Sequence, residues 1–173
     1  SRADGMTALM CAAQNGRSAC LQALLHAGAK IDQARSDGMT ALMLAALSSD
    51  TAPLHMLLKS RANVDLAQPD GLTALIVAAR NGHTATLQAL IHAGAKVDQA
   101  QTDGWTALIW AAKNGYTASL TALLQAGAKV DQATTDGISA LMWAAQNGHT
   151  ATMQALLQAG TKIEQVKADG TSA

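Results

Sequence analysis

The fold of this chain is decided by the sequence of residues 70–102, DGLTALIVAARNGHTATLQALIHAGAKVDQAQT. The same pattern recurs every 33 residues, and each copy begins with an Asp-Gly pair. A fixed period of this length indicates a repeat array rather than a set of separate domains. The aspartates that mark the period are Asp4, Asp37, Asp70, Asp103, Asp136 and Asp169.

Each copy contains two segments with the spacing of amphipathic helices, separated by glycine. In residues 70–102, Leu75 and Ala79 lie on the apolar face of the first segment, and Leu87 and Leu90 on that of the second. A Thr or Ser stands before each segment, where its side-chain oxygen is expected to cap a backbone N–H of the helix. The expected caps are Thr7, Thr40, Thr73, Thr106 and Ser139 for the first helix and Ser18, Thr51, Thr84, Thr117 and Thr150 for the second.

These motifs resemble the ankyrin repeat family over residues 4–173. The resemblance rests on DGxTAL at the start of the first helix, AAxNGH at the turn between the helices and LLxAGAKVD at the end of the second helix. The family's TPLH motif is replaced here by TALM or TALI, so its His is missing. The resemblance implies an all-α solenoid of stacked helix-turn-helix repeats with hairpin-like loops, curved with a concave face. The single domain, 1–173, would contain repeats 4–36, 37–69, 70–102, 103–135 and 136–168 and a truncated sixth repeat, 169–173.

Composition and charge argue against several function classes. The chain has 12 Lys and Arg against 12 Asp and Glu, so no net charge attracts nucleic acid or an anionic membrane surface. Its longest apolar runs, such as residues 41–47, are far shorter than the ~18 residues of a membrane span, and no secretory segment begins the sequence. We therefore predict no nucleic-acid partner, no membrane partner and a cytoplasmic location.

The cysteines and histidines show no pattern typical of a catalytic or metal site. Cys11 and Cys20 lie at apolar positions without CxxC spacing, so we predict free, buried thiols in a reducing compartment. The five histidines are scattered over three places in the repeat, and no GKS or GKT phosphate loop occurs. His83 and His149 are expected to make structural contacts at the inter-helix turn. We predict no enzymatic activity, no cofactor and no catalytic or metal-binding residue.

Large apolar residues occupy the position two residues after each Asp. In the family that this sequence resembles, partners usually contact the loop tips and the exposed side of the first helix, which together form the concave face. These apolar residues either form an exposed seam along that face or tilt into the core between repeats, and the sequence leaves both interpretations open. They are Met6, Met39, Leu72, Trp105 and Ile138.

All four aromatic residues lie between positions 105 and 143. Trp110 and Trp143 occupy the same place in successive repeats, so we expect them side by side at the ~10 Å spacing of packed helices. Because Trp is enriched at binding hot spots, we favour partner binding for Trp105, and partial burial for Trp110 and Trp143. Polar residues on the last turn of the first helix would form the rim. The candidate partner-binding residues are Met39, Leu72, Arg80, Trp105, Trp110, Lys113, Ile138, Trp143 and Gln146.

The second repeat departs most from the pattern. Ser49 and Arg61 replace two glycines, Pro53 lies near the start of the second helix, and Pro69 lies in the following loop. Pro53 is tolerated in the first turn of a helix, whereas Arg61 in a left-handed conformation costs on the order of 1 kcal/mol relative to Gly. We interpret these changes as drift in a repeat that is held between two neighbours.

The sequence predicts a protein–protein interaction module that presents a rigid concave surface to a protein or peptide partner. We expect it to be a recognition fragment of a larger protein, and to be a monomer with weak end-to-end association. The alternative is a structural spacer or self-assembling stack with no specific concave-face ligand. A consensus scaffold made by design fits the near-identical repeats, but not the cysteines, the methionines or the irregular second repeat.

Overall fold

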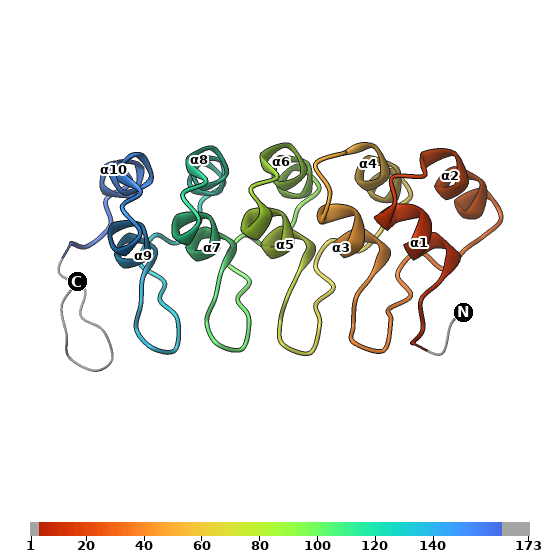
Figure 1. The fold of residues 1–173 in the computed structure, drawn as a ribbon, viewed down its shortest axis with the longest axis horizontal. Helices are drawn as coiled ribbons and strands as arrows, with labels where there is room; N and C mark the ends of the chain where they lie inside the picture. Colours follow the sequence, from red (N-terminus) through yellow and green to blue (C-terminus); the bar gives the residue numbers. More distant parts are fainter. Residues whose placement is uncertain (1–3, 164–173) are drawn as a thin grey trace.

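The structure is a computed structural model that describes residues 4–163. In this part of the chain ten α-helices and no strand are present, and the helices form five successive pairs. The odd-numbered helices form one row, the even-numbered helices form a second row, and the loops project from the first row away from the second (Figure 1). The predicted all-α solenoid is confirmed; the predicted start of a sixth repeat, 169–173, lies outside the described residues. The helices are α1 (Ala8–Gln14), α2 (Ser18–His26), α3 (Ala41–Ala46), α4 (Ala52–Lys59), α5 (Ala74–Asn81), α6 (Thr84–His92), α7 (Ala107–Lys113), α8 (Thr117–Gln125), α9 (Ala140–Gln146) and α10 (Thr150–Gln158).

The first helix of each pair begins at the predicted cap. Thr73 lies just before α5 in an extended conformation, and its Oγ1 accepts a hydrogen bond from the Ile76 backbone N–H at 3.3 Å. This bond satisfies one of the N–H groups that have no partner within the helix. The same cap is made by Thr7, Thr40, Thr106 and Ser139.

The predicted caps of the second helix are wrong. Thr84 is already the first residue of α6, and the preceding His83 makes no side-chain cap hydrogen bond. The Thr84 hydroxyl instead lies 2.8 Å from the hydroxyl of Ser119, and Thr117 pairs in the same way with Thr152 at 2.8 Å. Ser119 and Thr152 are buried, and a buried hydroxyl without a partner is costly, so these pairs join successive even-numbered helices. The other predicted caps, Ser18, Thr51, Thr117 and Thr150, likewise make no side-chain cap hydrogen bond.

The core lies between the two rows and between neighbouring repeats. In α5 every residue from Ala74 to Ala79 is buried, because α3 and α7 pack on its two sides. In α6 only one face is buried, through Leu87 and Leu90. With no Phe in the chain, alanine and medium-sized aliphatic side chains fill this space at the close packing of a protein interior.

Backbone hydrogen bonds close each loop and also join it to a neighbouring loop. Ala100 and Thr106 form an antiparallel bridge that closes the loop before α7. The Thr102 N–H donates to the carbonyl oxygen of Asp70 in the preceding loop at 2.8 Å. Pro69 occupies the place of Thr102 one repeat earlier and has no N–H, so it cannot make the corresponding bond.

A column of carboxylates also joins successive repeats. The Asp98 carboxylate accepts the backbone N–H of Lys129 in the next repeat at 2.9 Å, and Asp131 accepts that of Lys162 at 3.0 Å. The Lys162 N–H stabilises the charged carboxylate and lowers the pKa of Asp131. The Lys129 ammonium reaches only 4.0 Å from Asp98 and is largely exposed, so the backbone bond is the stronger link.

The second repeat keeps its helices despite its irregular sequence. Pro53 lies in the first turn of α4, as expected, and is buried there. Arg61 adopts a left-handed conformation with a φ of 65°, the conformation that glycine adopts at this place in the other repeats. The predicted strain at Arg61 is therefore present in the structure and is confined to an exposed position after the helix.

The two cysteines are free, as predicted, but the prediction that they are buried is wrong. Cys11 and Cys20 are exposed and line a shallow hollow with Leu24 on the side of α1 and α2 that faces away from α3. Their positions are buried in the next repeat, where Leu44 and Pro53 replace them. Leu44 and Pro53 lie between two neighbouring repeats, whereas the described part of the chain places a repeat on only one side of α1 and α2.

Candidate functional site

Three tryptophans form one cluster, which we call the indole cluster: Trp105 before α7, Trp110 on α7 and Trp143 on α9. The Trp105 ring centroid lies 4.2 Å from that of Trp110 and 5.2 Å from that of Trp143, with interplanar angles of 31° and 38°. Trp110 and Trp143 lie on neighbouring helices, as expected, and the Trp105 ring contacts both of them. All three rings are half-buried, so part of each faces solvent.

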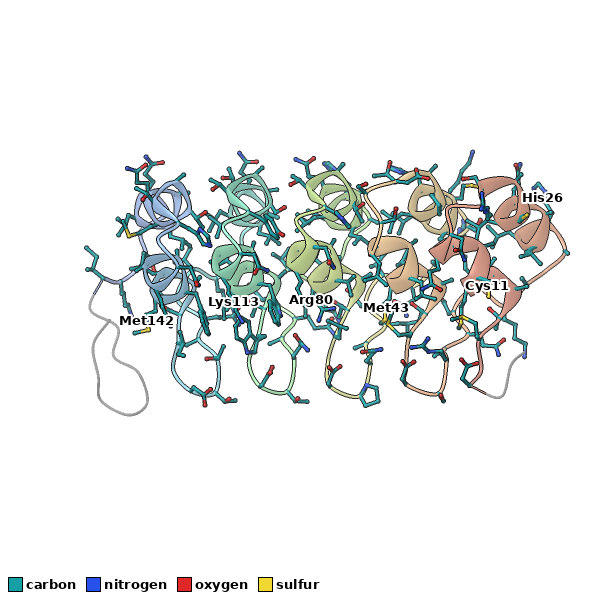
Figure 2. All side chains as sticks on the ribbon, viewed as in Figure 1. Cys11, His26, Met43, Arg80, Lys113 and Met142 are labelled. Atoms are coloured by element: carbon teal, nitrogen blue, oxygen red, sulfur yellow. The ribbon has the colours of Figure 1, made fainter. Side chains whose placement is uncertain are left out.

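Two basic residues lie over the rings. The Lys113 Nζ is 4.7 Å from the centroids of Trp105 and Trp143 and 5.1 Å from that of Trp110. The Arg80 Cζ lies 5.7 Å from the Trp110 centroid. These distances fall within the ~6 Å range of cation–π attraction. Arg80 and Lys113 come from the last turns of α5 and α7, and Figure 2 shows them at the base of these helices, next to the loops.

The neighbouring repeats fix the helix ends that carry these cations. The Asn114 side chain donates to the carbonyl oxygen of Arg80 at 3.1 Å, and a ring nitrogen of His149 lies 3.0 Å from the carbonyl oxygen of Lys113. His83 makes the corresponding contact with a carbonyl oxygen of α3, at 3.2 Å. The prediction that His83 and His149 make structural turn contacts is confirmed.

One indole N–H is tied to the loops. The Trp110 Nε1 donates to the Gln101 side-chain oxygen at 3.0 Å, and the Gln101 amide donates to the Asp70 carboxylate at 3.2 Å. This chain of bonds connects the indole cluster to two successive loops. The Trp143 Nε1 is buried and donates to no atom of the described residues. Sequence reasoning missed Gln101, because its role depends on a contact between a loop and a helix face.

The other predicted partner-binding residues divide into exposed and buried ones. Gln146 is exposed at the end of α9, and Ile138 is half-buried before it. Met39 and Leu72 are only 9% and 7% exposed, because their side chains pack into the core between repeats. Of the two interpretations that the sequence leaves open, burial between repeats therefore holds at Met39 and Leu72, so these two candidate partner-binding residues have almost no surface to offer a partner.

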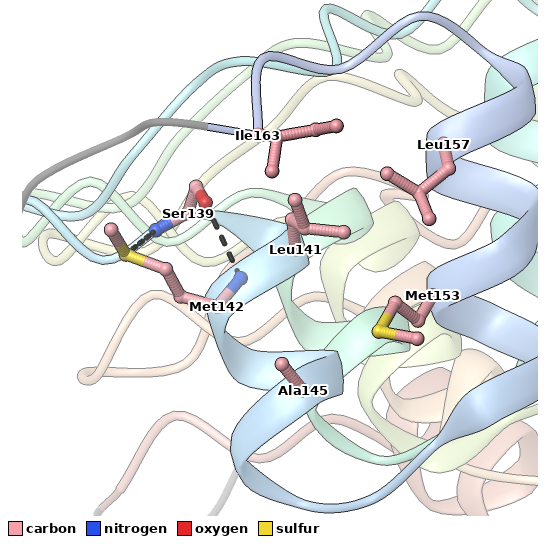
Figure 3. A pocket seen from close by; sticks show the side chains of 7 residues that line it. All are labelled: Ser139, Leu141, Met142, Ala145, Met153, Leu157 and Ile163. Carbon is pink, nitrogen blue, oxygen red and sulfur yellow. Dashed lines mark hydrogen bonds between the residues drawn. The ribbon is translucent and has the colours of Figure 1, made fainter. Parts of the chain in front are cut away.

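A second feature is an apolar groove on the last described helix pair, lined by Leu141, Met142, Met153, Leu157 and Ile163 (Figure 3). Leu141 is half-buried, whereas Leu108, which holds the same position one repeat earlier and is followed by another helix pair, is only 3% exposed. Within residues 4–163 no further helix pair follows to cover this groove.

Other kinds of site are not found in the described part of the chain. Residues 4–163 contain no group of three or more His, Cys, Asp or Glu side chains placed to hold a metal ion. None of the helices described is long and apolar enough to cross a membrane.

Family models account for nearly the whole chain. A model described as ankyrin repeats in three copies matches residues 1–66 and 48–134, and a model described as ankyrin repeat matches residues 136–168. No curated protein matches the chain.

Proposed function

Because the chain belongs to the ankyrin repeat family, whose repeats are generally protein–protein interaction modules, we propose that it binds a protein or peptide partner at the indole cluster. The cluster would lie on the concave face of the solenoid. Family members are typically binding modules without enzymatic activity. The observation that carries the proposal is the gathering of all three tryptophans, with a lysine and an arginine above them, in a chain with only one other aromatic residue.

The binding surface is rigid before the partner arrives. Trp105 packs against Trp110 and Trp143, and the Lys113 carbonyl is held by the next repeat, so few groups lose freedom on binding. Preorganisation of this kind favours affinity, and Trp and Arg are the residues most often found at hot spots. Contact energy would centre on Trp105 and Lys113, with Gln146, Ile138 and Arg80 around them. The whole stack, 1–173, would act as one domain.

The decisive variant is Trp105→Ala. We expect it to weaken partner binding by ~2 kcal/mol or more, which is about thirtyfold in Kd, because it removes the central ring of the cluster. Partners would be selected from a peptide library that covers a proteome, and their Kd values measured by isothermal titration calorimetry. Binding that is unchanged by Trp105→Ala in every selected partner would refute the proposal.

Trp105→Ala also lowers stability, because each aromatic contact contributes about 0.5–1.5 kcal/mol and Trp105 makes two. Calorimetry is therefore run well below the unfolding temperature, with the helix content of each variant checked by circular dichroism. Leu157→Ala is the matched control, since Leu157 is also a large, partly exposed apolar residue but lies away from the cluster. We expect Leu157→Ala to leave the partner Kd unchanged.

The apolar groove supports the alternative function of a self-assembling stack or spacer. If a second copy of the chain covers this groove, Leu157→Ala reduces association measured by light scattering at high protein concentration, whereas Trp105→Ala does not. The two variants thus separate a partner-binding module from a stack with an idle concave face.

A further inference from the structure

We propose that the partner of the indole cluster is an acidic peptide segment, which places an Asp or Glu carboxylate on Lys113 and Arg80 and an apolar side chain on the Trp105 ring. The inference rests on the proposed function and names the chemistry of the partner at that same site.

The two cations have aromatic contacts but no counter-ion among the described residues. Within residues 4–163, no carboxylate comes within 4.0 Å of either side chain. Some other basic residues do have a carboxylate partner, since Arg35 binds Asp37 and Lys96 reaches the Asp65 carboxylate at 3.8 Å. Exposed cations such as Lys30 also lack a carboxylate in the described part of the chain, but Arg80 and Lys113 lack one while lying over aromatic rings. Two adjacent cations without a carboxylate form a positive spot on a chain that has no net charge.

The Lys113 ammonium has a defined position over the rings. Contacts with three rings hold the Nζ in one place, whereas a surface lysine is ordinarily free to move. An ammonium has three N–H donors, so those that point away from the rings remain available to an acceptor. The residue is half-buried, and a charge-assisted hydrogen bond in partly desolvated surroundings is shorter and stronger than a neutral one.

The same arrangement disfavours a basic partner. Indole faces attract cations, and three rings around one ammonium resemble the aromatic cages that hold such ligands. In this chain Lys113 itself takes the place of the cation. A lysine or arginine from a partner would have to displace Lys113 and would then face two like charges, since Arg80 also lies over the Trp110 ring. A carboxylate meets neither obstacle.

The test is a selection from a random linear peptide library displayed on phage, using the wild-type chain and Trp105→Ala in parallel. Peptides that bind only the wild type are sequenced, and their Kd values are measured by calorimetry. We expect Asp and Glu to be enriched beside apolar residues. Replacing both cations, Lys113→Gln with Arg80→Gln, should weaken these peptides by about tenfold or more.

Two further variants keep the result interpretable. Lys30→Gln removes the same charge from an exposed lysine in the first repeat and should leave each Kd unchanged. Lys113→Arg keeps the positive charge and should preserve the preference for acidic peptides. A substitution at Lys113 that acted only by damaging the fold would lose that preference whatever the charge of the new residue. Selected peptides that are neutral or basic, or acidic peptides that bind the double variant as tightly, would overturn the inference while leaving the proposed function intact. If no peptide depends on Trp105, the proposed function itself fails.

Discussion

Replacing Gly71 by Ala tests how tightly each loop is packed against the next. Gly71 has a φ of 86°, and a Cβ added there would lie 2.8 Å from both the carbonyl oxygen of Ala100 and the Cα of Gln101. Both are backbone atoms of the following loop, so they cannot move aside as the end of a flexible side chain does. The matched control is Gly94→Ala, because Gly94 has a φ of 89° and an added Cβ would meet nothing within 4 Å.

The two variants share one cost and differ in the other. An L-residue in the left-handed region costs roughly 1–2 kcal/mol, which applies to both positions. Overpacking against backbone adds about 1–3 kcal/mol, which applies to Gly71 alone. We therefore expect a loss of about 1–2 kcal/mol for Gly94→Ala and about 2–5 kcal/mol for Gly71→Ala.

The assay is urea unfolding followed by circular dichroism, which gives a free energy of unfolding for each variant. The free energies are compared between variants that have the same slope of free energy against urea concentration. Because Gln101 also accepts the Trp110 N–H, Gly71→Ala should weaken binding at the indole cluster, and Gly94→Ala should not. Equal losses of stability in the two variants would show that the loops yield freely and therefore do not hold the cluster in place.

Three further results are expected. The Arg35 guanidinium lowers the pKa of Asp37 from 3.8 to about 2, so this carboxylate stabilises the fold above pH 3.8 and the contribution is lost as the pH falls toward 2. When the urea midpoint is measured against pH, it should therefore decline less in acid for Asp37→Asn than for the wild type. Thr117→Val leaves the buried Thr152 hydroxyl without its partner and should cost about 1–3 kcal/mol, part of which the double variant with Thr152→Val recovers in a urea double-mutant cycle. Cys11 and Cys20 should react with an aromatic disulfide reagent in the folded protein, measured by the absorbance of the released thiolate; reaction only after unfolding would contradict their exposure.

The repeat and the start of its first helix were predictable because the signals are local. Thr73 caps α5 through a bond to a residue three positions along the chain, which any copy of the repeat carries within itself. The prediction of caps for the second helices was wrong because a hydroxyl such as that of Thr84 bonds instead to Ser119 in the next repeat. A local pattern shows that an oxygen is available at a helix start, but not that a neighbour offers a better partner.

The candidate site was predictable in its members and not in its geometry. Because Trp110 and Trp143 occupy equivalent positions in successive repeats, the sequence correctly predicted that they lie on neighbouring helices. The place of Trp105 between them depends on how the loop returns to α7, and the place of Lys113 depends on where its long side chain comes to rest. Burial of Leu72 was open in the sequence for the same reason, since a residue at a junction between loop and helix can turn either way.

The indole cluster also makes the chain its own optical reporter. Since Trp105, Trp110 and Trp143 are all the tryptophans in the sequence, indole fluorescence from the entire protein originates at this one site. Rings this close couple electronically, so their near-ultraviolet circular dichroism records their mutual orientation as well as their solvent exposure. Occupancy of the site can therefore be followed without a label, and any spectral change locates the event to one junction between two repeats.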